Sequence, residues 1–354
     1  MNNTLTPTGL QTPDSRLKDF IGRLMRREDL SRTEAHDLLD AMLDGEATDG
    51  QIAATLIALK LKGETVEELA GLAEGMRARA VRIQSRHERF IDTAGTGSSA
   101  GKCFNVSTAA AFVIAGAGLP VAKHGNRAAS SKCGSADVLA ALGVNVSVAP
   151  DVSERCLNEL GICFMFAPLY HGATARVAGI RRQLGVQTTF NLLGPLTNPA
   201  GAPRQIIGVS RREFVEPMAR ALSLLGTERA WVVHGADGLD EITLAEKTFV
   251  AEAAAGTFRS FEIAPEDFGI QRGSLAGLGG GGAEENAAII RDVLGGQRRD
   301  GARTLVLLNA AAALHVGSTA ADLEKGMRWA EDSIDGGRAI AKLDELVRMT
   351  NAGE

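Results

Sequence analysis

Residues 92–109 read DTAGTGSSAGKCFNVSTA. In this segment a short apolar run is followed by glycine and hydroxyl residues. Gly95 and Gly97 leave backbone N–H groups accessible, and residues 105–108 (Asn-Val-Ser-Thr) have the composition of a helix start. N–H groups at a helix N-terminus bind phosphate. Neither the Rossmann nor the Walker glycine pattern is completed, so the glycines alone favour an ordinary turn. The helix start beside them changes the interpretation to phosphate binding.

Two further turns combine cations with small or polar residues. Residues 123–127 (Lys-His-Gly-Asn-Arg) come directly after an apolar run, and strand ends in α/β sheets face the ligand crevice. Residues 130–135 (Ser-Ser-Lys-Cys-Gly-Ser) form a second hydroxyl-rich turn. We expect the two turns to hold both ends of a ligand with several phosphates.

Carboxylates cluster in residues 237–241, Asp-Gly-Leu-Asp-Glu. Adjacent acids in a turn can converge on Mg²⁺, which favours a few carboxylates plus substrate phosphates. Taken alone, the pattern fits a solvated acidic turn as well as a Mg²⁺ site. The presence of the phosphate-binding turns makes us favour the Mg²⁺ site.

Arginines and prolines follow in residues 176–199. Arg176, Arg181 and Arg182 fall in or near a helical pattern, where surface charge is the usual explanation. Residues 191–199 (Asn-Leu-Leu-Gly-Pro-Leu-Thr-Asn-Pro) read as a rigid apolar loop.

The elements that must position these residues divide into two groups. Apolar residues at helical spacing predict a first helix over 17–25, and three capping boxes predict three more, at Ser31 with Glu34, Thr48 with Gln51 and Thr65 with Glu68. From Phe90 onward, short apolar runs alternate with helical patterns, which indicates a largely parallel sheet covered by helices. The expected strands are 121–122, 163–166, 205–209 and 230–233, and the expected helices are 107–117, 134–142, 153–160 and 212–225. We interpret the glycine run 279–282 as a surface linker.

Composition limits the function classes. The net charge of −5 gives no support for nucleic acid as a partner. No apolar run reaches the length of a membrane span, and the first residues lack a signal-peptide pattern, so no membrane association is expected. The four cysteines have no metal or disulfide spacing, which predicts reduced thiols and a cytoplasmic protein.

Taken in order, these segments resemble the anthranilate phosphoribosyltransferase family over nearly the whole chain. The stretches that carry the resemblance are 123–127, 131–137, 190–199, 234–243 and 309–314. The resemblance implies an α/β fold with a small helical domain and a large α/β domain around a mainly parallel sheet, and an active site in the cleft between them. It implies a helical domain of residues 1–86 with 174–198 added, an α/β domain of residues 87–354, and a homodimer joined through the helical domains.

The resemblance also implies substrates and site residues. It predicts transfer of the 5-phosphoribosyl group of 5-phosphoribosyl 1-pyrophosphate to the amino group of anthranilate, in tryptophan biosynthesis. Phosphoribosyl pyrophosphate is expected at Gly95, Gly97, Ser98, Ser99, Asn105, Ser107, Thr108, Lys123 and Ser135. Anthranilate is expected at His124, Asn126, His171, Arg181, Gly194 and Pro195, and Mg²⁺ at Ser107, Asp240 and Glu241. No catalytic residue is assigned; His124 is a candidate proton acceptor.

Two stretches depart from the family pattern. Residues 95–100 read Gly-Thr-Gly-Ser-Ser-Ala where the family has Gly-Thr-Gly-Gly-Asp-Gly, and Gly172 and Thr174 replace a usual proline and a bulky residue. The alternatives are a phosphoribosyltransferase of the same fold with another aromatic acceptor, and a low-activity paralogue that binds phosphoribosyl pyrophosphate.

Overall fold

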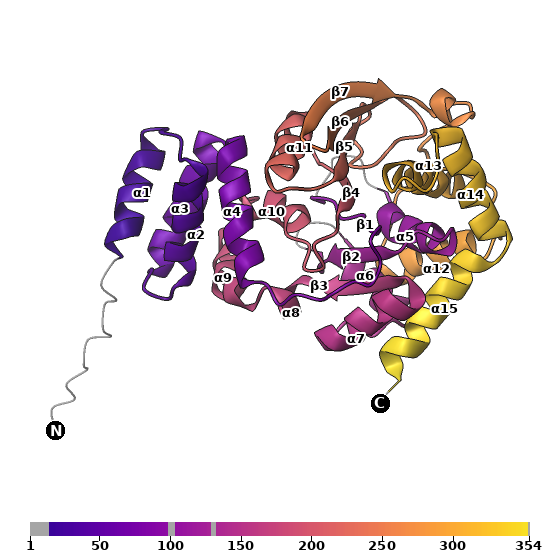
Figure 1. Ribbon diagram of the computed structural model, residues 1–354, viewed down its shortest axis with the longest axis horizontal. Coiled ribbons are helices and arrows are strands. Elements are labelled where there is room, and N and C mark those ends of the chain that lie inside the picture. The colour runs from indigo at the N-terminus through magenta and orange to yellow at the C-terminus, as the bar shows by residue number, and fades with distance from the viewer. Residues whose placement is uncertain (1–13, 98–102, 129–131, 353–354) are drawn as a thin grey trace.

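The computed structural model describes residues 14–97, 103–128 and 132–352. Its N-terminal part is a bundle of four helices, shown at the indigo end of the chain in Figure 1: α1 (Ser15–Met25), α2 (Arg32–Leu43), α3 (Asp49–Lys62) and α4 (Val66–Arg79). The three predicted capping boxes, at Ser31, Thr48 and Thr65, are confirmed at the starts of α2, α3 and α4. Each box satisfies backbone N–H groups that the first turn of a helix leaves unpaired.

A seven-stranded sheet forms the centre of the rest of the described chain, in the order β3-β2-β1-β4-β5-β6-β7. Its strands are β1 (Ile91–Asp92), β2 (Val121–Gly125), β3 (Ile162–Phe166), β4 (Arg204–Gly208), β5 (Arg229–Gly235), β6 (Thr248–Ala254) and β7 (Thr257–Ile263). Strands β1 to β5 pair in parallel, and β6 and β7 add an antiparallel hairpin. The mainly parallel α/β prediction is confirmed, and the hairpin was not predicted.

Helices cover both faces of the sheet (Figure 1). The remaining α-helices are α5 (Val106–Gly116), α6 (Ser135–Ala141), α7 (Pro150–Arg155), α8 (Ala167–Tyr170), α9 (Ala175–Leu184), α10 (Phe190–Leu196), α11 (Val215–Leu224), α12 (Ala283–Leu294), α13 (Gly301–Val316), α14 (Leu323–Asp335) and α15 (Arg338–Asn351). The predicted helix over 153–160 is an α-helix that continues as a π-helical turn, Cys156–Leu160.

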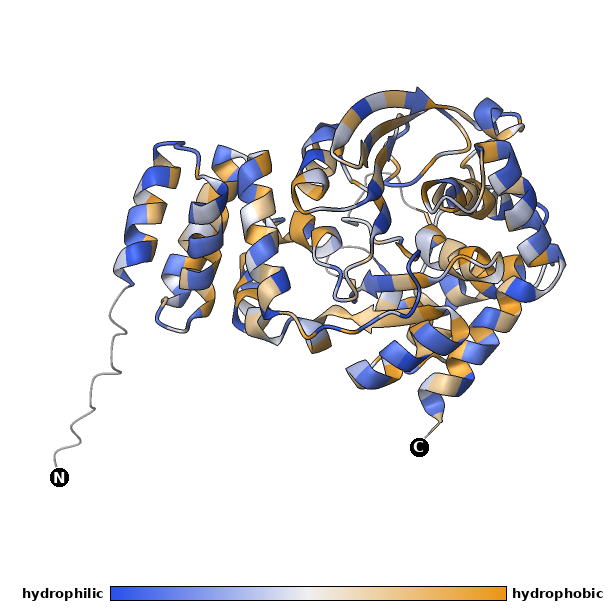
Figure 2. Cartoon of the chain, viewed as in Figure 1, coloured by the Kyte–Doolittle hydropathy of each residue, from blue (hydrophilic) through white to orange (hydrophobic). Residues whose placement is uncertain are grey.

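Alternate residues of the central strands enter two different cores. Ile206 and Trp231 pack with the core that contains α5 and α13, whereas Ile207 and Val232 pack with a core shared by α11 and the helical bundle. This follows from the two-residue period of a strand, with both faces of the sheet buried. Figure 2 shows apolar and polar residues interspersed along the helices and strands. The bundle is thus packed against one face of the sheet through α11.

Residues 191–199, predicted as a loop, are mostly helical, which corrects that prediction. Helix α10 contains Pro195 near its end, and Thr197 follows it. Proline is tolerated there because the helix is short and ends at the next residue, Leu196. Arg77 of α4 donates to the carbonyl oxygens of Leu196 (2.7 Å) and Leu225 (3.2 Å), which joins the bundle to the ends of α10 and α11.

Cys103, Cys156 and Cys163 are free thiols among the described residues. Within the same ranges, no helix combines the length and apolar content that crossing a membrane would require.

Candidate active site

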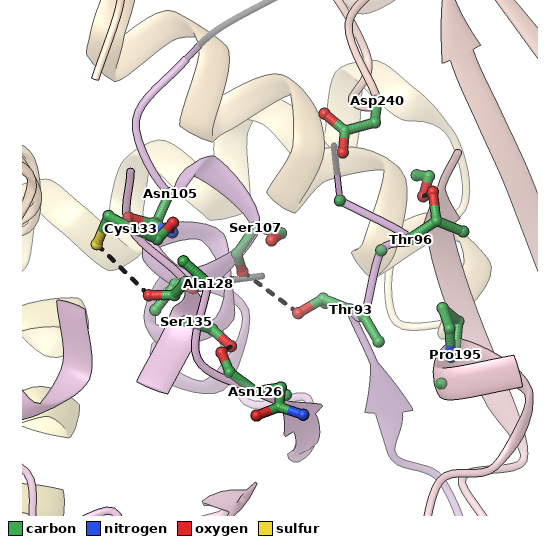
Figure 3. A pocket seen from close by; sticks show the side chains of 18 of the residues that line it. Thr93, Thr96, Asn105, Ser107, Asn126, Ala128, Cys133, Ser135, Pro195 and Asp240 are labelled. Carbon is green, nitrogen blue, oxygen red and sulfur yellow. Dashed lines mark hydrogen bonds between the residues drawn. The ribbon is translucent and has the colours of Figure 1, made fainter. Parts of the chain in front are cut away.

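A cavity of about 570 Å³ lies at the carboxyl ends of the parallel strands. Segments after β1, at the end of β2, at the end of β4 and after β5 line it, together with α9, α10 and the start of α5. Figure 3 shows Thr93, Ser107, Asp240 and Pro195 around this space. Every predicted site residue lines the cavity except His171, which lies beside it, and Ser98 and Ser99, which fall outside the described residues.

The loop after β1 is held close to the end of β4. Gly95 bridges Gly208, and the Thr96 N–H donates to the Gly208 carbonyl at 2.9 Å. A Cβ on Gly95 would lie 3.1 Å from that carbonyl oxygen, and Gly97 has a φ of +62°. Glycine suits both positions, because one requires close backbone approach and the other a left-handed conformation.

Helix α5 begins at the cavity, as predicted, but Asn105 does not cap it through its side chain. The Asn105 amide instead donates to the Cys133 carbonyl at 3.3 Å and accepts from Asn286 at 3.0 Å. Asn105 thus occupies the N-cap position as expected, but its side chain binds distant segments instead of the helix N–H groups. The N–H groups of the first turn of α5 have acceptors within the protein, among them Glu241 for Ser107 and the Asn105 carbonyl for Thr108, so the side chains of this turn are the groups left for a ligand. The Thr108 hydroxyl on this turn is buried and has no hydrogen-bond partner in the described structure.

Lys123, at the end of β2, is a buried cation. Its Nζ donates to the carbonyl oxygen of Thr93 at 2.9 Å and lies 3.4 Å from the Ser107 hydroxyl. Burial lowers the pKa of Lys123, and the nearby carboxylates of Asp92 and Glu241 oppose that shift. The ammonium group is therefore held rigidly beside the start of α5, where an anionic ligand would relieve the cost of its burial.

Asp240 and Glu241 follow β5 and line the same cavity as Lys123. Glu241 accepts from the Ser107 N–H at 3.1 Å, and its pKa is raised by burial and by neighbouring Asp240. Two neighbouring carboxylates and a serine provide oxygen ligands that suit a hard cation. The described residues contain no group of three or more His, Cys, Asp or Glu placed to hold a metal alone. A cation here would therefore need further oxygen ligands from a substrate.

Two neutral histidines form another part of the site. The Nδ1 of His124 lies 3.1 Å from the Gly194 carbonyl, and its ring centroid is 5.1 Å from that of His171. Burial lowers the pKa of His124 to about 3 and that of His171 to about 4. A carbonyl only accepts, so the proton of His124 is on Nδ1 and its Nε2 carries a lone pair. The Nε2 atoms of both rings are buried without a partner in the described structure.

Arg181 lines the cavity from the end of α9. It is not the surface charge that the helical pattern suggested, because burial lowers its pKa and no described carboxylate pairs with it. Its Nε is buried without a hydrogen-bond partner. Pro195 also lines the cavity, and Asn126 and Ser135 lie together across from it (Figure 3). The Ser135 hydroxyl donates to the Asn126 carbonyl at 3.4 Å.

Several lining residues were not predicted. Gly280 and Gly281, interpreted as a linker, line the cavity, and a Cβ on Gly280 would lie 2.7 Å from the Cα of Phe104. The glycine run is therefore required for close packing against the start of α5. Gln187 and Asn191 also line the site. Asn191 falls within the stretch 190–199 that carries the family resemblance, which was its signal in the sequence.

Comparison with known families gives a class that agrees with this architecture. The model of the glycosyl transferase family helical bundle domain matches residues 18–80, and that of the glycosyl transferase family a/b domain matches residues 87–340. The helical bundle and the sheet with its cavity are thus the two parts of a glycosyl transferase.

Individual relatives narrow the class. The anthranilate phosphoribosyltransferase of Moorella thermoacetica is 50% identical over 94% of this chain and 97% of the relative. The crystal structure of the Thermus thermophilus anthranilate phosphoribosyltransferase has a TM-score of 0.88 and 40% identity, covering 94% and 100% of the two chains. That of Saccharomyces cerevisiae, in complex with phosphoribosyl pyrophosphate and magnesium, has a TM-score of 0.87 and 27% identity, covering 96% and 99%. The chain belongs to the anthranilate phosphoribosyltransferase family.

Proposed function

We propose that this enzyme transfers the 5-phosphoribosyl group of 5-phosphoribosyl 1-pyrophosphate to the amino group of anthranilate and releases pyrophosphate. One observation carries the proposal. A single cavity joins a buried lysine and an acid pair to a half-buried Arg181, which has no described ion pair, and to apolar Pro195. The first set suits a polyphosphate with a metal, and the second suits an aromatic carboxylate.

Phosphoribosyl pyrophosphate would occupy the part of the cavity between β1 and α5. The N–H groups of the glycine loop, the Lys123 ammonium and the hydroxyl groups nearby are its donors. These residues are Gly95, Gly97, Asn105, Ser107, Thr108, Lys123 and Ser135. Ser98 and Ser99 stay predictions, since they lie outside the described residues.

Mg²⁺ would be held by Ser107, Asp240 and Glu241, together with phosphate oxygens of the substrate. When bound, the ion would neutralise charge on the pyrophosphate leaving group. A metal site that needs the substrate to complete it also couples metal binding to substrate binding.

Anthranilate would bind between the histidines and Arg181. The carboxylate would pair with Arg181, the ring would lie against Pro195 and Gly194, and Asn126 and His171 would border the site. A charge-assisted hydrogen bond of this kind contributes about 1.5–3 kcal/mol. The buried Nε of Arg181 would then gain the acceptor that it lacks.

The chain accelerates the displacement chiefly by holding two substrates in line. An arylamine is already a neutral nucleophile, and correct positioning alone contributes about 7–11 kcal/mol. The low pKa of His124 makes it a weak base, so its Nε2 lone pair is suited to accept a hydrogen bond from the amine and orient it. Proton removal would follow attack, when the nitrogen has become acidic.

Assembly, location and domain limits stay proposals. We propose a homodimer joined through the helical domains and a cytoplasmic location, the latter supported by the free thiols. We also keep the division into 1–86 with 174–198 and 87–354. Its support is the core that α1 to α4 share with residues of α9 and α10, although that core extends to α11 and one face of the sheet.

Loss of anthranilate fluorescence on addition of phosphoribosyl pyrophosphate and Mg²⁺ tests the proposal. We expect the loss to require all three components and to be abolished in a Lys123→Ala variant. Turnover of another aromatic amine in preference to anthranilate would support the alternative acceptor. Binding of phosphoribosyl pyrophosphate without turnover of any amine would support the low-activity paralogue.

A further inference from the structure

The guanidinium of Arg181 is held in place by a hydrogen bond to the side chain of Asn191. An Nη of Arg181 donates to the Oδ1 of Asn191 at 3.1 Å. The cation also lies over the ring of Phe190, 5.5 Å from the ring centroid. No described carboxylate forms an ion pair with Arg181, and burial alone accounts for its lowered pKa. Its hydrogen-bond acceptor is therefore neutral, although a buried arginine commonly pairs with an acid.

Asn191 is itself fixed by the start of α10. The Thr188 N–H donates to the same Oδ1 at 3.0 Å, and the Asn191 N–H donates to the Thr188 carbonyl at 2.9 Å. Two N–H donors point to one side-chain atom, so that atom is the amide oxygen and not the nitrogen. The reciprocal pair resembles a capping box and leaves the oxygen no freedom to move.

This turn is also attached to the helical bundle. The Thr189 hydroxyl donates to the Oε1 of Glu64 at 2.7 Å, and Thr189 is fully buried. Glu64 lies between α3 and α4. The position of the Asn191 oxygen therefore depends on both parts of the fold.

We propose that Asn191 is a positioning residue for substrate recognition: its neutral oxygen aims the Arg181 guanidinium into the cavity and leaves the full positive charge for the substrate carboxylate. An aspartate at this position would orient the arginine equally well, but its carboxylate would form an ion pair with Arg181 and neutralise the charge. The inference rests on the proposed function, because it gives Arg181 the carboxylate of the acceptor as its partner.

The substitution Asn191→Asp tests the inference directly. Aspartate keeps the acceptor for Thr188 and suits the N-terminal turn of α10, so a purely structural role predicts unchanged stability and kinetics. We expect instead a rise of at least about tenfold in the KM for anthranilate, as loss of a charge-assisted pair implies. The KM for phosphoribosyl pyrophosphate and the kcat should change by less than about threefold, since Arg181 faces the acceptor.

Gln187→Glu is the matched control, because it adds the same charge to the cavity wall at a residue without a described bond to Arg181. Its effect on the anthranilate KM should be several-fold smaller than that of Asn191→Asp. A second probe, the uncharged analogue 2-aminobenzamide, should bind the wild type and Asn191→Asp with affinities within about threefold of each other.

An active wild type with an unchanged anthranilate KM in Asn191→Asp would overturn the inference and leave the proposed function intact. Equal effects of Gln187→Glu and Asn191→Asp would also overturn it, because the cause would then be charge in the cavity in general. A wild type without anthranilate turnover would instead refute the proposed function.

Discussion

The Nδ1 of His124 donates a hydrogen bond to the carbonyl oxygen of Gly194 over 3.1 Å. His124 lies at the end of β2, and Gly194 lies in α10. This bond therefore joins the strand that presents Lys123 to the helix that presents Pro195. The two halves of the cavity, one suited to phosphate and one to an aromatic acid, are held at a fixed separation by it.

Replacing Arg181 with alanine should weaken anthranilate binding selectively. The variant loses the cation that would pair with the anthranilate carboxylate, so the KM for anthranilate should rise roughly 10- to 100-fold. The KM for phosphoribosyl pyrophosphate should change less than about threefold. Steady-state kinetics with each substrate varied in turn measures both, and equal increases would refute the assignment.

Gly208→Ala should disrupt the proposed metal and pyrophosphate site. A Cβ there would lie 1.7 Å from the Asp240 carbonyl oxygen, so the acidic turn must move. Overpacking of this kind costs about 1–3 kcal/mol, and we expect the KM for phosphoribosyl pyrophosphate to rise and its Mg²⁺ requirement to increase.

Gly282→Ala is the control, since a Cβ at Gly282 meets no atom within 4 Å and its φ is −73°. This variant should stay within about twofold of the wild type. If the Gly208→Ala enzyme has a normal KM for phosphoribosyl pyrophosphate and a normal Mg²⁺ requirement, the position of Asp240 is not required for metal and pyrophosphate binding.

Asn198→Ala should destabilise the whole fold. The Asn198 amide donates to Asp92 at 2.7 Å and to the Ala122 carbonyl at 2.8 Å, and burial raises the pKa of Asp92 to about 6. Leaving buried acceptors unpaired costs about 1–3 kcal/mol per group. Urea denaturation should show this loss, whereas Asn158→Ala, which removes two exposed hydrogen bonds, should stay within about 0.5 kcal/mol. Equal stability of the two variants would contradict the prediction.

The stability of the protein should depend on pH through His171. Burial lowers its pKa to about 4, against about 6.5 in an unfolded chain. Between these values the unfolded state binds a proton that the folded state does not, so the free energy of unfolding falls as pH falls. His171→Gln removes this dependence. As the pH falls from 6.5 to 5, the free energy of unfolding of this variant should rise by about 2 kcal/mol relative to that of the wild type. A difference independent of pH would contradict the buried, neutral state of His171.

The sequence predicted the features that depend on neighbouring residues. The capping boxes at Ser31, Thr48 and Thr65 join residues three apart, and they were visible without a structure. The apolar run before Lys123 likewise marked strand β2, although the strand continues through Lys123 to Gly125 rather than ending before the charged residues.

Features that depend on distant segments were missed or misjudged. Asn105 faces Cys133 and Asn286 rather than its own helix, and Gly280 packs on Phe104. Arg181 is buried because α10 folds beside it, which no local pattern of charge reveals. Each of these features depends on contacts between segments that are far apart in the chain, and such contacts are not visible in a single sequence.

The central claim is that the two halves of one cavity hold two substrates for transfer. The most direct measurement follows pyrophosphate release and anthranilate consumption in the same Mg²⁺-containing reaction, by ³¹P NMR and fluorescence. The account predicts one pyrophosphate released for each anthranilate consumed, and no release beyond a trace without anthranilate. Pyrophosphate release that continues at the same rate without anthranilate, or no anthranilate consumption at any Mg²⁺ concentration, would contradict it.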